Sequence, residues 1–111
     1  MDSILIDDGY TTTRNIPGVP GLHPDLCIMY RPALTKERII YRSRNSSADP
    51  SVIDLHEVEL IGKFLVSING KELKKEEVAR LKPAVRAHIV DLILGYLPAD
   101  EAKDQGNSSG G

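Results

Sequence analysis

The sequence predicts an α+β fold in which an N-terminal antiparallel β-hairpin packs on a small bundle of three to four helices. Two short runs of β-forming residues lie near the start of the chain, on either side of a loop rich in proline and glycine. Later segments repeat apolar residues with the helical period of about 3.6. A chain of 111 residues is the size of one domain, which we expect to span residues 1–97.

The predicted strands are residues 10–16 (YTTTRNI) and residues 26–30 (LCIMY). Both runs are bounded by residues that neither a helix nor a central strand tolerates: the PGVPG run follows the first, and Pro32 closes the second. We expect the two strands to pair antiparallel. The stiff loop between them is a candidate contact surface, because exposed loops often carry contacts.

Residues 35–44 (TKERIIYRSR) follow, and Thr35 can cap a short helix there. Such a helix would have a small apolar side, and its other side would be basic, with Lys36, Arg38, Arg42 and Arg44. The composition leaves open whether this segment is helix or extended strand.

The longest periodic apolar segment is residues 49–68, which we predict to be one helix. Asp49 stands at the N-cap, and Pro50 supplies a favourable φ at the first helical position. A helical projection places its large apolar residues in one arc: Val58, Leu60, Ile61, Phe64, Leu65 and Ile68. Asn69-Gly70 is predicted to end this helix, because glycine readily adopts the left-handed conformation past a C-terminus.

Two further helices are predicted, a short one over residues 74–81 and a last one from Pro83 to residue 97. The last helix is apolar nearly all round, so we expect it to be the most buried. Pro98 stops it. Residues 98–111 contain no large apolar side chain and are predicted to form a disordered C-terminal tail that folding does not require.

Arg86 falls within the apolar arc of the last helix, and Glu57 and Asp54 fall within that of the long helix. If the short helix returns the chain, the two long helices run roughly parallel and these charges meet. We therefore predict a structural ion pair between Arg86 and Glu57 or Asp54. The alternative is that Arg86 is exposed and binds a carboxylate of a partner protein.

The charge balance, 14 Lys plus Arg against 16 Asp plus Glu, gives no general attraction to nucleic acid or anionic membranes. Cys27 is the single cysteine, so no internal disulfide can form, and a reducing compartment such as the cytoplasm is expected. The N-terminus lacks the pattern of a signal peptide. No stretch approaches the roughly 20 apolar residues of a membrane span.

Each candidate catalytic or metal-binding group in the sequence can also be explained without a catalytic or metal-binding role. His56-Glu57 resembles the start of a zinc-protease helix, but Leu60 stands where that motif needs its second histidine. His23, Asp25 and Cys27 alternate and could share a strand face as metal ligands, although a fourth ligand is missing. No nucleophile elbow or phosphate-binding glycine loop occurs. We therefore expect a protein that is not an enzyme and that binds no metal or cofactor.

The order of several short motifs resembles small phage and prophage proteins of the tail-assembly-chaperone kind. In chain order these motifs are DGYT, GLHP, YRPAL, a Glu-Arg pair, HEVELIGKFLVSI, a GK-containing loop and an apolar C-terminal helix. Together they cover most of residues 8–97. The most specific pieces are Tyr30-Arg31-Pro32 with Arg38, and the pairing of the long helix with Asn69-Gly70-Lys71 and the last helix. The resemblance implies a non-enzymatic protein of the host cytoplasm that binds a tail component during virion assembly.

In this interpretation the partner-binding residues are Tyr30, Arg31, Pro32, Arg38 and Tyr41. Pro32 forces extended geometry on the residue before it, so Arg31 would be presented at the end of the strand. We expect Tyr30 and Arg31 to belong to a partner surface and not to the core, so that Arg31→Ala leaves melting nearly unchanged. The alternative function is a nucleic-acid-associated protein that uses the basic patch from Arg31 to Arg44.

Overall fold

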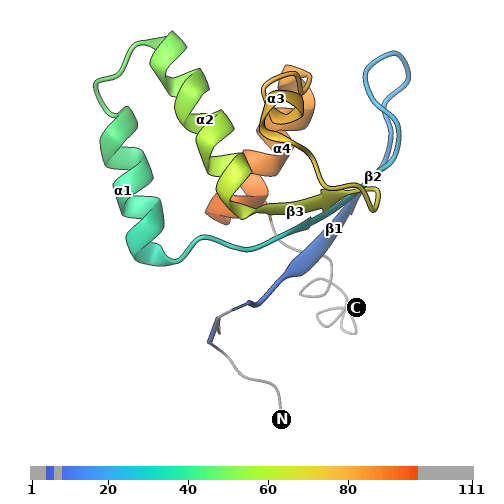
Figure 1. Ribbon diagram of the computed structural model, residues 1–111, viewed down its shortest axis with the longest axis horizontal. Helices are drawn as coiled ribbons and strands as arrows, with labels where there is room; N and C mark the ends of the chain where they lie inside the picture. Colours follow the sequence, from blue (N-terminus) through green and yellow to red (C-terminus); the bar gives the residue numbers. More distant parts are fainter. Residues whose placement is uncertain (1–4, 7–8, 98–111) are drawn as a thin grey trace.

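The computed structural model describes residues 5–6 and 9–97 (Figure 1). Its elements in chain order are β1 (Thr12–Ile16), β2 (Leu26–Tyr30), α1 (Thr35–Asn45), α2 (Pro50–Phe64), β3 (Leu65–Ile68), α3 (Lys75–Val78) and α4 (Pro83–Leu94). An N-terminal antiparallel hairpin followed by helices confirms the predicted α+β fold. The predicted tail, residues 98–111, lies outside the described residues.

The sheet is antiparallel, with the strand order β1-β2-β3. Its central strand alternates: Leu26, Ile28 and Tyr30 are buried, whereas Cys27 and Met29 are exposed. One face of the sheet therefore packs on the core and the other faces solvent, as is common for antiparallel sheets. The helices lie together above the strands in the view of Figure 1.

The predicted long helix ends early. α2 begins at Pro50 behind Asp49, as the sequence predicts, but it stops at Phe64, and residues 65–68 form β3 instead. The run LVSI suits a buried helix turn and a strand equally well, so periodicity could not separate the two. Pairing with β2 decides for the strand, because it satisfies the backbone groups of both segments.

Asn69-Gly70 ends a strand and not a helix. Both residues have positive φ, 53° and 81°, and the turn closes with a 2.9 Å hydrogen bond from the Ile68 N–H to the Lys71 carbonyl. Glycine and asparagine are the residues that adopt this conformation most easily. Asn69-Gly70 therefore does end an element, as the sequence predicts, but that element is β3 and not the long helix.

α1 is a helix, which settles the alternative that the sequence left open. Thr35 is its first residue and not its cap. The Glu37 carboxylate instead accepts a 2.9 Å hydrogen bond from the Leu34 N–H. None of the α1 residues, all of which the structure describes, is buried. The helix is therefore held on the outside of the domain.

α4 is the most buried helix, as predicted, and its buried residues are Val85, Ile89, Val90, Leu92, Ile93 and Leu94. It ends at Leu94, before the predicted boundary at residue 97, because Gly95 adopts a left-handed φ of 86°. The N–H of Tyr96 then bonds the Asp91 carbonyl at 2.8 Å. α3 is also shorter than predicted and buries Val78.

The predicted ion pair is present. Arg86 Nε lies 3.0 Å from Glu57 Oε1, and an Arg86 terminal nitrogen lies 3.2 Å from Asp54 Oδ1. The Arg86 and Glu57 side chains are 20% and 24% exposed, so the pair is largely shielded from water. Burial raises the pKa of Glu57, the Arg86 charge opposes that rise, and the carboxylates of Asp54 and Asp91 add to it. Arg86 thus joins α4 to α2.

Arg86→Met tests this role, because it keeps the apolar bulk and removes the charge. We expect a loss of about 1–3 kcal/mol in the free energy of unfolding, between the values for exposed and buried pairs. A second change, Glu57→Gln, should restore part of the loss, since it removes the unpaired carboxylate. Urea unfolding of both single variants and the double variant measures the coupling. Unchanged stability in Arg86→Met, with an additive double variant, would contradict the bridge.

The raised pKa of Glu57 leads to a second prediction, which concerns how the stability of the fold depends on pH. A carboxyl whose pKa is raised in the folded state contributes stability that is present below its ordinary value of 4.5 and is lost as pH rises through the folded value. The wild-type protein should therefore lose stability relative to Glu57→Gln as pH rises from 4 to 7. Unfolding at a series of pH values measures the difference, and a change of the opposite sign would show a lowered pKa.

Candidate functional site

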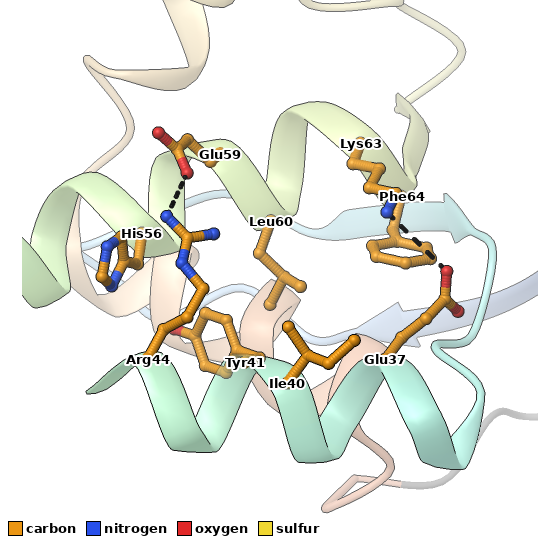
Figure 2. Close-up of a pocket in the computed structure, with 9 residues that line it drawn as sticks. All are labelled: Glu37, Ile40, Tyr41, Arg44, His56, Glu59, Leu60, Lys63 and Phe64. Atoms are coloured by element: carbon orange, nitrogen blue, oxygen red, sulfur yellow. Dashed lines mark hydrogen bonds and ion pairs between the residues drawn. The ribbon is translucent and has the colours of Figure 1, made fainter. Parts of the chain in front are cut away.

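A groove runs between α1 and α2 (Figure 2). Its volume is about 180 Å³, and we call it the α1–α2 groove. The residues that line it come from one face of each helix: Glu37, Ile40, Tyr41, Arg44, His56, Glu59, Leu60, Lys63 and Phe64.

The floor of the groove is apolar. Leu60 and Phe64 of α2 are 7% and 4% exposed and belong to the core. Ile40 stands on the opposite wall and is 50% exposed, so half of a large apolar side chain is left uncovered beside the core (Figure 2). An apolar side chain of a partner placed here would extend the core, and its burial would be favourable.

Ion pairs cross the groove. Arg44 lies 3.1 Å from Glu59 Oε1, and Lys63 Nζ lies 3.8 Å from Glu37 Oε2, each joining α1 to α2 (Figure 2). Exposed pairs of this kind contribute about 0–1 kcal/mol each. They can therefore open for a partner at small cost, and they place charges of both signs around an apolar floor.

The end of the groove near the α1–α2 connection is polar. His56 Nδ1 is hydrogen-bonded to Asn45 Oδ1. Burial raises the pKa of the Tyr41 hydroxyl, and its hydrogen bond with Asn45 opposes the rise. Tyr41, a predicted partner-binding residue, thus lines the groove as part of a hydrogen-bonded group.

A second hollow adjoins the groove, and we call it the N-terminal hollow. Its volume is about 300 Å³. It is lined by Ile6, Gly9 and Tyr10 from the segment before β1, by Arg31, Pro32 and Leu34 from the β2–α1 connection, and by Glu37, Lys63 and Phe64. The last three residues also line the α1–α2 groove, so the two form one continuous surface.

Tyr30 was predicted to be part of a partner surface outside the core, and this prediction is wrong. Its side chain is 2% exposed and packs in the core. The alternation of β2 places Tyr30 on the same inner face as Leu26 and Ile28. The same alternation was visible in the sequence and would have predicted its burial.

Arg31 is exposed, but its guanidinium is used within the chain. It donates a 2.7 Å hydrogen bond to the Lys63 carbonyl and lies 5.6 Å from the centre of the Phe64 ring. Carbonyls in the last turn of a helix have no partner within the helix, and the helix dipole favours a cation there. Arg31 therefore caps α2, while the half-buried Pro32 lines the N-terminal hollow.

Arg38 has the same role at the end of α4. It donates to the Leu94 carbonyl at 3.3 Å and to Thr35 Oγ1 at 3.3 Å. Arg42 donates to the Tyr96 hydroxyl at 3.0 Å, with its guanidinium 5.7 Å from the ring centre. These arginines of the predicted basic patch are thus paired inside the domain and do not form a row of free cations.

The possible metal ligands His23, Asp25 and Cys27 do not share a strand face, because β2 begins only at Leu26. His23 is buried with its ring against His88, and Asp25 accepts a 2.6 Å hydrogen bond from the Gly18 N–H. Cys27 is exposed. Among the described residues, no group of three or more His, Cys, Asp or Glu side chains could hold a metal ion.

The capping role of the arginines corrects the expectation that Arg31→Ala leaves melting unchanged. We expect Arg31→Ala and Arg38→Ala each to lower the free energy of unfolding by about 0.5–2 kcal/mol, because a charged donor to a helix C-terminus is lost. Lys36→Ala, an exposed change on the same helix as Arg38, is the matched control. Thermal unfolding measures all three, and arginine variants that melt with the control would exclude the caps.

Comparison with known proteins identifies no relative: no family model, no curated protein and no solved structure matches the chain. In the part of the chain that the structure describes, no helix has the length and apolarity needed to cross a membrane.

Proposed function

We propose that the protein is a non-enzymatic adaptor of the tail-assembly-chaperone kind, which binds a segment of a phage tail component during virion assembly. The observation that carries the binding role is the α1–α2 groove, where the exposed Ile40 stands beside a buried apolar floor. The class of partner comes from the resemblance of the YRPAL and HEVELIGKFLVSI segments to phage proteins of this kind.

The lining of the α1–α2 groove suits one apolar anchor side chain of a protein partner. Its floor, Leu60 and Phe64, is apolar, and Ile40 is half exposed beside it. Its polar groups are paired with one another, Arg44 with Glu59 and Lys63 with Glu37, which suits a polar rim around such an anchor.

The alternative, a nucleic-acid-associated protein, has less support. A phosphate-binding surface needs cations that can turn toward the ligand, and each phosphate contact replaces a counterion. Arg31 and Arg38 would have to give up helix carbonyls to reach a phosphate, and Arg44 would have to leave Glu59. The net charge of -2 adds no general attraction.

Ile40→Glu tests the groove, with Ile39→Glu as the matched control. The two isoleucines are neighbours in α1 with similar exposure, 50% and 56%, but only Ile40 lines the groove. Tagged full-length protein is used to capture partners from cells in which the phage is induced, and captured proteins are identified by mass spectrometry. We expect a tail component in the wild-type and Ile39→Glu samples, and at least a tenfold loss with Ile40→Glu, as for an anchor residue.

Equal capture by both variants would exclude the groove as the binding site. A salt series separates the two functions. Capture through an apolar anchor should persist at high salt, whereas binding to phosphates should fall steeply with the logarithm of salt concentration. Capture that is lost in this steep manner, together with nucleic acid in the sample, would favour the alternative.

A further inference from the structure

The turn after β3, Asn69-Gly70, is a pair of residues with a reactivity of its own. When glycine follows asparagine, the backbone nitrogen of the glycine can attack the side-chain amide of the asparagine, because no glycine side chain shields that nitrogen. Both residues are exposed, and a Cβ added at Gly70 would meet nothing within 4 Å. Water therefore has access to the turn, and no neighbouring group crowds the attacking residue.

The reaction is balanced by water alone. The Gly70 nitrogen bonds to Asn69 Cγ, and the bond between Cγ and Nδ2 breaks, so that Nδ2 leaves as ammonia with the proton of the Gly70 amide. Water then opens the resulting cyclic imide at either of its carbonyls. The products are aspartate and isoaspartate, in which the backbone continues through the side-chain carbonyl carbon. No electrons are transferred, and the turn gains a negative charge.

The fold holds the Asn69 side chain away from this reaction. Its Oδ1 accepts a 2.7 Å hydrogen bond from the Cys27 N–H, and its Nδ2 donates at 3.2 Å to the Asp25 carbonyl. The Asn69 N–H donates at 2.8 Å to the Cys27 carbonyl and so continues the pairing of β3 with β2. Bonds at both ends of the amide fix its plane, so it is not free to turn its face toward the Gly70 nitrogen. Attack therefore requires local opening of the turn.

The product does not fit the place that Asn69 occupies. A carboxylate only accepts hydrogen bonds. One oxygen can still accept from the Cys27 N–H, but the other would face the Asp25 carbonyl, where Nδ2 now donates. Isoaspartate also lengthens the backbone of a turn that is closed by two hydrogen bonds of 2.9 Å between Ile68 and Lys71. Neither product can restore the contacts that the amide makes.

We propose that Asn69 is a site of spontaneous deamidation that the native sheet protects, and that its conversion detaches the end of β3 from β2 in one direction only. Each opening of the turn exposes the amide to a reaction that does not reverse, so the turn sets a lifetime for the folded protein. The inference concerns the sheet and does not depend on what the α1–α2 groove binds.

The first test compares the full-length protein in buffer and unfolded in guanidinium chloride, both at neutral pH. Peptide mapping with mass spectrometry follows deamidation at each asparagine. Asn45 is the control within each sample, because Ser46 follows it and its side-chain oxygen is hydrogen-bonded to His56. In denaturant we expect Asn69 to react faster than Asn45. In buffer Asn69 should react at least roughly tenfold more slowly than in denaturant, since opening must come first.

Equal Asn69 rates in buffer and in denaturant would overturn the protection by the sheet. An Asn69 rate in denaturant no greater than that of Asn45 would overturn the site itself.

The second test concerns the product. Asn69→Asp reproduces the aspartate form, and Asn69→Gly is the matched control, because glycine accepts the φ of 53° and removes the same side-chain bonds without adding charge. Asn69→Asp should melt below the wild type at neutral pH. The difference should narrow as pH falls through about 4, because a protonated carboxyl can donate to the Asp25 carbonyl. The difference between Asn69→Gly and the wild type should not change with pH. Wild-type stability of Asn69→Asp at neutral pH, or a loss independent of pH, would overturn the detachment of β3.

Discussion

The structure depends on one connection, the short segment between β2 and α1, which bonds the C-terminal ends of both long helices. The N–H of Arg31 donates to the Phe64 carbonyl at 2.8 Å, and the N–H of Ala33 donates to the Ile93 carbonyl at 3.0 Å. The Arg31 guanidinium adds a bond to Lys63. Terminal carbonyls of buried helices need partners, so this connection fixes where α2 ends and how α4 lies against it.

The same connection explains why the candidate site lies where it does. Because the chain is held at the ends of α2 and α4, α1 starts there and runs along the outside of α2 without burying any residue. Polar bonds at its surface, from Arg38 to Leu94 and from Arg44 to Glu59, hold it in place. The α1–α2 groove lies between this helix and α2, and Tyr41 packs against the core at its side.

Several charged side chains are paired within the fold. Arg86 and Glu57 each lie among the apolar residues of their own helix, and their pairing offsets part of the cost of burial, although the pKa of Glu57 stays raised. Arginines between β2 and the end of α1, most of them exposed, are paired with carbonyls, a hydroxyl and a carboxylate. For this reason a basic stretch in the sequence became part of the scaffold, and the recognition surface proposed here is the apolar groove beside it.

Local chemistry in the sequence determined the hairpin, the helix starts at Pro50 and Pro83, and the burial of α4, because residue propensities and hydrophobic periods act within one element. It also determined the pairing of Arg86 with Glu57, because a charge on the apolar face of a helix needs a partner on another element. Tertiary structure alone decided that residues 65–68 form a strand, that Arg31 and Arg38 cap helices, and that a groove opens beside Ile40. Each of these outcomes depends on which segments, distant in sequence, lie side by side. A period or a propensity carries no information about that, so only the folded chain could settle it.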